Sequence, residues 1–207
     1  MASSTRLRGI EVVVFDLGGV LVRLGSYTDV VGEDSMSADE FWSMWLSSPA
    51  VRRLDGGVSS VNEFGEEIVK ELGLPFAPQE LIQRFLEWPK GLFDGAYEVV
   101  QRVRESRTVA VLSNINVLHW TSQRDHETIS RMFDVQFLSY EIGLVKPDLT
   151  VFHHVINELG VEPDAIFFLD DNQANVSAAR GVGIDAVLVN SVDQMRRALV
   201  DRGVLHL

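Results

Sequence analysis

Short apolar runs alternate with helix-like segments along this chain, and this alternation restricts the fold more than any other feature. Helical stripes occupy 96–103 and 149–159, where apolar residues recur every three or four positions. Strands that alternate with helices predict βαβ units and a parallel sheet. We therefore expect an α/β fold whose strands lie at 10–14, 109–112, 135–138, 166–169 and 186–189.

A long segment between the first two runs, residues 24–91, carries no strand pattern and is too long to be a loop. Within it, Ser60 and Glu63 have the spacing of a capping box that opens a helix. We expect a small helical insertion rooted at the carboxyl end of the first strand, where it would act as a lid. The remaining residues, 1–23 and 92–207, would form the α/β core.

The first strand ends at Asp16, and Gly18 and Gly19 follow it closely. Ligands of open α/β sheets bind beyond the carboxyl ends of the strands. Glycines allow a close approach of the backbone, so we expect both to contact a bound substrate. A carboxylate at this edge suits a nucleophile or a metal ligand. The alternative is that Asp16 merely caps a turn or the next helix.

Polar residues also mark three later strand ends or loops. The hydroxyl of Ser113 and the backbone N–H of Asn114 suit an anion, although Ser-Asn is also common in turns. Lys146 precedes a helix, where its charge either faces the strand ends or is solvated. Asp170 and Asp171 end a strand side by side, and such carboxylates repel one another unless a cation compensates. Oxygen-ligated Mg²⁺ is a natural occupant of such a site.

The charge balance limits the partners of this chain. It has 30 acidic residues against 18 Lys and Arg, a formal net charge of −12, which argues against binding to nucleic acid or an anionic membrane. An anionic substrate would need local capture by a cation or a lysine. The absence of cysteine fits a reducing compartment, and no apolar stretch reaches the length of a transmembrane helix. We expect a cytoplasmic protein; the sequence does not indicate an oligomeric state.

Taken in order, the four strand-end features resemble the motifs of the haloacid dehalogenase-like hydrolase superfamily. The resemblance covers nearly the whole chain, through 12–16, 111–114, 146–147 and 167–171. The most similar subgroup is the small phosphatases with a helical cap inserted after the first strand. This resemblance implies a Rossmann-like parallel sheet flanked by helices, with a small all-helical cap.

The resemblance also implies roles for single residues. Asp16 would attack phosphorus and form an aspartyl-phosphate. Ser113 and the Asn114 backbone would bind the phosphoryl oxygens, and Lys146 would neutralise the nucleophile and the phosphate. Phosphoryl transfer requires that the reacting groups are positioned and that their negative charge is neutralised, and these roles meet both requirements.

The implied metal is Mg²⁺, with Asp16, Asp171 and the carbonyl of Gly18 as ligands and Asp170 in support. Gly18 is also a departure, because most phosphatases of the family carry there a second aspartate that protonates the leaving group. A general acid is worth about 10²–10⁴ in rate. We therefore expect a steep dependence on leaving-group pKa and accumulation of phosphoenzyme, unless the substrate or the cap supplies the proton.

The leading hypothesis is a Mg²⁺-dependent phosphatase acting on a small phosphorylated metabolite such as a sugar phosphate. A haloacid dehalogenase-type hydrolase is one alternative, but it needs no cation, so the acidic pair speaks against it. A catalytically weak phosphate-binding or regulatory domain is the other, supported only by Gly18. In the cap, Arg52 and Arg53 are candidates for substrate contact or for a solvated face. We expect packing or surface roles for the histidines.

Overall fold

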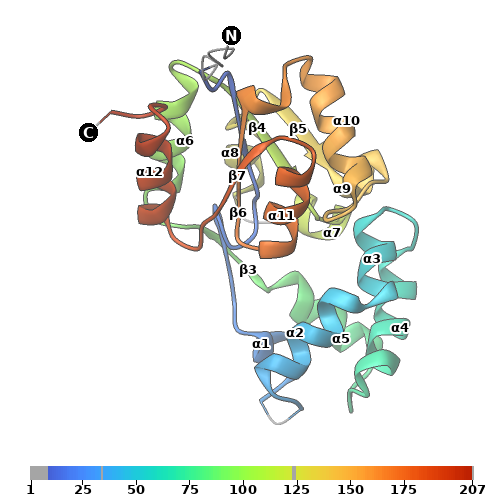
Figure 1. The fold of residues 1–207 in the computed structure, drawn as a ribbon. Coiled ribbons are helices and arrows are strands. Elements are labelled where there is room, and N and C mark those ends of the chain that lie inside the picture. The colour runs from blue at the N-terminus through green and yellow to red at the C-terminus, as the bar shows by residue number, and fades with distance from the viewer. Residues whose placement is uncertain (1–8, 34, 123–124, 207) are drawn as a thin grey trace.

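The computed structural model describes residues 9–33, 35–122 and 125–206. Its centre is a five-stranded parallel sheet in the order β5-β4-β1-β6-β7 (Figure 1). The strands are β1 (Val12–Phe15), β4 (Thr108–Ser113), β5 (Val135–Leu138), β6 (Ile166–Asp170) and β7 (Asp185–Leu188). Each overlaps one of the expected apolar runs, which confirms the α/β fold.

Helices cover both faces of this sheet (Figure 1). The helices of the core are α6 (Ala96–Arg104), α7 (Val117–Ser122), α8 (His126–Arg131), α9 (Ser139–Ile142), α10 (Leu149–Leu159), α11 (Gln173–Gly181) and α12 (Val192–Asp201), with a 3₁₀ turn at Pro163–Ala165. In β1, Val13 and Phe15 join the apolar cluster under α6 and α12, whereas Val12 and Val14 join the cluster under α10 and α11. A strand buried on both sides explains the unbroken apolar run.

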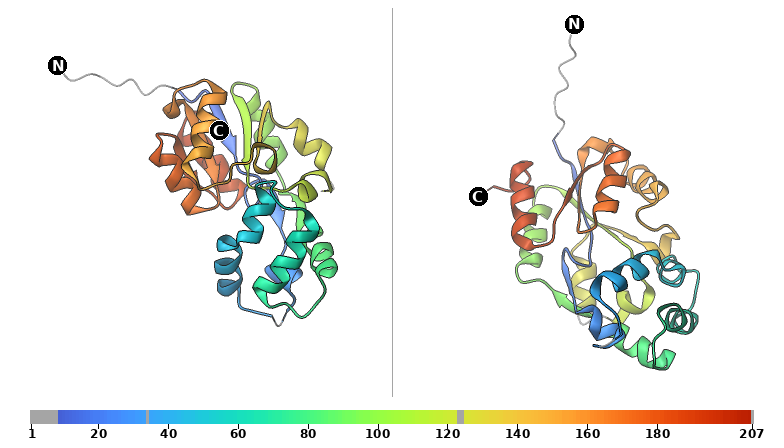
Figure 2. Two further views of the ribbon diagram at one scale, coloured as in Figure 1. Left: turned by 90° about the vertical axis from the view of Figure 1, so that its right-hand side faces the viewer. Right: turned by 60° about the horizontal axis from the view of Figure 1, so that its bottom comes forward.

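The insertion, residues 24–91, forms a separate helical lobe at one end of the sheet (Figure 2). Its helices are α1 (Tyr27–Val31), α2 (Ala38–Ser47), α3 (Pro49–Asp55), α4 (Val61–Leu72) and α5 (Pro78–Leu86). They enclose an apolar cluster of their own, in which the rings of Phe41, Trp45, Phe64, Phe85 and Trp88 pack together. Ser60 and Glu63 form the expected capping box of α4. None of the helices described is long and apolar enough to cross a membrane.

At its base the insertion differs from the purely helical unit expected from the sequence. Strands β2 (Val22–Leu24) and β3 (Pro89–Leu92) pair antiparallel where the chain enters and leaves it. The segment of β3 lacks an apolar alternation and includes a proline and a glycine. It becomes a strand because β2 offers it a partner, and strand formation depends strongly on such context.

The parallel strands bring their carboxyl ends to one edge of the sheet. Asp16 follows β1, Ser113 ends β4 and Asp170 ends β6, and β1 lies between the other two strands. The insertion lies on the same side (Figure 1). The fold therefore gathers the predicted site residues at the junction of the two lobes.

Candidate active site

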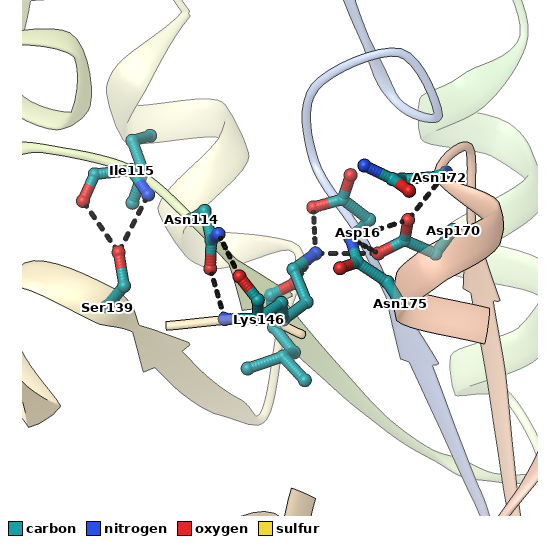
Figure 3. Close-up of polar contacts among 9 residues, drawn as sticks. Asp16, Asn114, Ile115, Ser139, Lys146, Asp170, Asn172 and Asn175 are labelled. Carbon is teal, nitrogen blue, oxygen red and sulfur yellow. Dashed lines mark hydrogen bonds and ion pairs between the residues drawn. The ribbon is translucent and has the colours of Figure 1, made fainter. Parts of the chain in front are cut away.

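Lys146 is the centre of the site. Its Nζ donates to Oδ1 of Asp16 at 2.7 Å, to Oδ2 of Asp170 at 2.7 Å and to the carbonyl oxygen of Leu112 at 2.9 Å (Figure 3). An ammonium has three N–H donors, and three acceptors from β4 and from the ends of β1 and β6 meet them here. The side chain is only 2% exposed. Lys146 is therefore a buried, fully bonded cation and not a solvated lysine.

The backbone of Lys146 is held by the side chain of Asn114. Its Nδ2 donates to the Lys146 carbonyl at 2.9 Å, and its Oδ1 accepts from the Lys146 N–H at 2.8 Å (Figure 3). Buried Ser139 fixes the same loop, because its Oγ accepts from the N–H of Ile115 at 2.9 Å and donates to the Ile115 carbonyl at 3.0 Å. The sequence analysis assigned a role only to the backbone of Asn114. It missed Ser139, although this residue directly follows strand β5.

Asp170 accepts hydrogen bonds from several donors. It is fully buried, and its Oδ1 accepts from the N–H of Asn172 at 2.8 Å and from Nδ2 of Asn175 at 3.0 Å. Lys146 occupies the other oxygen, Oδ2, which Asn175 also approaches at 3.1 Å. Most of the acceptor capacity of Asp170 is thus used, and its main effect is to orient Lys146.

The electrostatics of the site follow from three carboxylates that share one ammonium. Burial raises the pKa of Asp16 to about 7; Lys146 opposes this shift, and Asp170 and Asp171 add to it. Partial burial, with Asp170 nearby, raises the pKa of Asp171 to about 6. Burial would lower the pKa of Lys146, but the charges of Asp16 and Asp170 outweigh burial and raise it. The site therefore favours the entry of a further cation.

The same carboxylates can form a metal site. Ligand oxygens of Asp16, Asp170 and Asp171 lie within 4.8 Å of one another, and hard cations such as Mg²⁺ prefer such oxygens. Gly19 has a φ of +74°, and a Cβ there would collide with the Asp171 carboxylate. A Cβ at Gly18 would meet only Cδ1 of Leu24, at 3.6 Å, which is an ordinary contact. These carboxylate oxygens fit Mg²⁺. The close approach of Gly19 to Asp171 explains why a glycine, which has no Cβ, stands at position 19.

The remaining predicted residues divide between the two lobes. Ser113 is buried at the end of β4, beside the strand that leads to Asp16. Arg53 lies in the insertion, where its Nη1 donates to Oε1 of Glu67 at 2.9 Å, while Arg52 pairs with Asp148 across the lobes. The structure thus places Ser113 among the strand-end residues. The ion pair that it describes for Arg53 lies within the insertion.

Two polar contacts between the lobes were missed by the sequence analysis. Oδ1 of Asp55, at the end of α3, accepts from Nδ2 of Asn116 at 3.2 Å. The ring of His119 lies 4.0 Å from that of Phe85, and its Nε2 is 2.7 Å from the Phe85 carbonyl oxygen. Burial raises the pKa of Asp55 to about 6 and lowers the pKa of His119 to about 4. Nothing in the local sequence distinguishes Asp55 from an ordinary helix end.

Comparisons with known proteins agree with this geometry. D-ribitol-5-phosphate phosphatase of Bacteroides thetaiotaomicron is 24% identical over 185 residues, which cover 85% of this chain and 90% of that protein. Phosphatase MT3486 of Mycobacterium tuberculosis is 26% identical over 200 residues and 92% of both chains. A match to drimenol cyclase drtB of Aspergillus calidoustus, 36% identical, spans 34% of this chain and only 13% of that protein.

A solved structure shares the fold. It is a HAD-family enzyme of Bacteroides thetaiotaomicron, a mutant in complex with magnesium and inorganic phosphate, with a TM-score of 0.75 and 22% identity. The alignment covers 92% of this chain and 99% of that one. The family model described as haloacid dehalogenase-like hydrolase matches residues 10–183. The chain therefore belongs to the haloacid dehalogenase-like hydrolase family, and it is a hydrolase with phosphatases among its relatives.

Proposed function

We propose that this protein is a Mg²⁺-dependent phosphatase that hydrolyses a small phosphorylated metabolite through an aspartyl-phosphate on Asp16. The observation that carries this proposal is the buried Asp16–Lys146–Asp170 group, with Asp171 held beside Gly19. It combines a nucleophile, a fixed cation and a metal-compatible carboxylate at one sheet edge. The phosphatases among the relatives support the same reaction.

The chemistry assigned to each residue follows from its position. Asp16 attacks phosphorus, and Lys146 stabilises both its carboxylate and the negative charge spread over the phosphoryl oxygens. Ser113 and the backbone N–H of Asn114 bind those oxygens. Asp16, Asp171 and the carbonyl of Gly18 would hold Mg²⁺, which would supply further charge neutralisation. Asp170 keeps Lys146 in place, since it is bonded to the same Nζ.

We further propose that the insertion, residues 24–91, acts as the cap that selects the substrate. Helix α3 contacts the core through the pairs Asp55–Asn116 and Arg52–Asp148, close to the loops that follow β4 and Lys146. A substrate bound at Asp16 would extend toward this junction. The D-ribitol-5-phosphate phosphatase among the relatives supports a sugar or polyol phosphate as the substrate class.

Phosphate release from 4-nitrophenyl phosphate, with Mg²⁺ and with a chelator, tests the reaction. We expect turnover only with the metal, and then a preference within a panel of sugar and polyol phosphates. Turnover of 2-haloacids in chelator would instead identify a dehalogenase. Binding of inorganic phosphate without any turnover would identify a phosphate-binding domain.

A further inference from the structure

Proton transfer is the part of the reaction that the strand-end residues leave unassigned. An alkoxide leaving group needs a proton, and the water that attacks the phosphoenzyme must lose one. Gly18 has no side chain to do this, Asp16 is the nucleophile, and Asp170 is bonded on both oxygens. Asp171 is one of the carboxylates that can bind a metal ion. Asp55, on the insertion, is a carboxyl group at the same edge that the reaction above does not use.

The structure holds Asp55 against the loop of the core that follows β4, beside the proposed phosphate ligands Ser113 and Asn114. Its partner Asn116 is 2% exposed and follows Ser113 by three residues. Oδ1 of Asn116 accepts from the N–H of His119 at 3.0 Å, which turns its Nδ2 toward Asp55. Just beyond Asp55, Gly57 packs so closely on the Tyr140 carbonyl that a Cβ would collide with it. The end of α3 therefore packs against the loop that follows β4 and against α9.

The surroundings of Asp55 suit a group that gives and takes a proton near neutral pH. Burial raises its pKa to about 6, and the hydrogen bond from Asn116 acts in the opposite direction. The charged and titratable groups nearby are engaged elsewhere, in the pairs Arg52–Asp148, Arg53–Glu67 and Tyr140–Glu141 and in the contact of His119 with Phe85. An acid works best when its pKa lies near the working pH.

We infer that Asp55 is the general acid and base of this site, supplied by the insertion in place of the carboxylate that Gly18 lacks. This inference rests on the proposed phosphatase function. As an oxygen of Asp16 bonds to phosphorus, the bond from phosphorus to the leaving oxygen breaks, and Asp55 gives that oxygen its proton. Water then attacks the phosphoenzyme and gives a proton to Asp55, while the bond between Asp16 and phosphorus breaks. The products are the alcohol and inorganic phosphate.

A leaving-group series tests this role without knowledge of the natural substrate. The substrates are substituted phenyl phosphates, from 4-nitrophenyl phosphate, whose phenolate departs unaided, to phenyl phosphate, which needs a proton. We expect kcat/KM of the wild type to vary little across the series. Asp55→Asn should lower kcat/KM for phenyl phosphate about 10²-fold more than for 4-nitrophenyl phosphate. It should also accumulate phosphoenzyme, visible as the mass of one added phosphoryl group.

Two controls separate proton transfer from a structural role. Asp39→Asn removes an exposed carboxylate of the insertion and should leave the series unchanged. Asn116→Ala removes the partner of Asp55 but not its proton, so it should lower kcat/KM similarly for all substrates. An equal loss across the series in Asp55→Asn, or no loss, would overturn the inference.

A second-site variant sharpens the test. Gly18 has no positive φ, and a Cβ there would make only an ordinary contact with Cδ1 of Leu24, so Gly18→Asp can introduce a carboxyl group two residues after Asp16. In the Asp55→Asn background it should restore the flat leaving-group dependence and remove the accumulated phosphoenzyme. Absence of any Mg²⁺-dependent turnover in the wild type would instead refute the proposed function, and the role of Asp55 with it.

Discussion

The core and the insertion contribute to the site in different ways. In the core, Asp16, Lys146 and Asp170 are buried and bonded to one another across three elements. The insertion reaches the same edge through isolated pairs, and one of them, Arg52–Asp148, is about half exposed on each side. Exposed ion pairs contribute little to stability. The charges that would stabilise phosphoryl transfer are thus fixed within the core, whereas the pair Arg52–Asp148, which joins the lobe that would select substrate, is exposed.

The strongest test of this contrast removes the nucleophile. Asp16→Asn keeps the shape of the side chain but removes the charge that we propose attacks phosphorus and binds the metal. We expect release of 4-nitrophenol from its phosphate ester to fall to background, while the circular dichroism spectrum stays unchanged. Asp39→Asn, in the insertion, should retain full activity. Substantial turnover in a pure Asp16→Asn sample would contradict the mechanism.

The metal requirement tests whether Asp170 and Asp171 have different roles. Chelation should abolish activity, and added Mg²⁺ should restore it. Asp171→Ala should raise the Mg²⁺ concentration needed for half-maximal rate more than Asp170→Ala does. Asp170→Ala should instead lower the free energy of unfolding more, because it removes one of the three acceptors of Lys146 and the acceptor of Asn175. An equal shift in Mg²⁺ requirement for both variants would contradict this assignment.

Removal of the fixed cation should have a smaller effect on rate. Lys146→Ala leaves Asp16 and Asp170 without their shared partner, and the loss of one such electrostatic contact costs about 10²–10³ in rate. The metal and the nucleophile remain, so some turnover should persist. Lys146→Arg should restore only part of the rate, because a planar guanidinium replaces a compact ammonium. A wild-type kcat in Lys146→Ala would show that this lysine does not act in the reaction.

The contrast between the lobes also explains what the sequence could predict. The sheet was predictable because strands buried on both faces, such as β1 and β6, read as unbroken apolar runs. Asp16 and Asp170 were predictable as neighbours because parallel strands bring their carboxyl ends together, whereas the place of Lys146, between α9 and α10, followed only from the family resemblance. The inferences about the sheet and these two carboxylates need only the local pattern and the order of the strands.

The missed features depend on pairs of residues that are far apart in the chain. Asp55 and Asn116 meet only when α3 packs against the core, and β3 becomes a strand only beside β2. The prediction that Arg53 contacts substrate stays a prediction, and its bond to Glu67 was not visible in the sequence either. Such contacts depend on how elements far apart in the chain pack together, for which the sequence offers no periodic signal.

The smallest expected effect concerns the contact between His119 and Phe85, which joins the two lobes. The pKa of His119 is lowered from 6.5 to about 4, so the unfolded chain binds a proton at a higher pH than the folded one. Stability from this group is therefore complete above pH 6.5 and is lost as the pH falls toward 4. Asp55 and Asp16 have raised pKa values and act in the opposite direction, so the wild type must be compared with a variant.

His119→Gln removes the titrating group and keeps an N–H donor. Between pH 7.5 and pH 5, the free energy of unfolding of the wild type relative to His119→Gln should fall by about 2 kcal/mol. The same comparison with His153→Gln, an exposed position on α10, should show little change. Chemical denaturation at both pH values measures the difference. An identical pH dependence in wild type and His119→Gln would mean that the imidazole is charged in the folded protein, and that this contact between the lobes tolerates the charge.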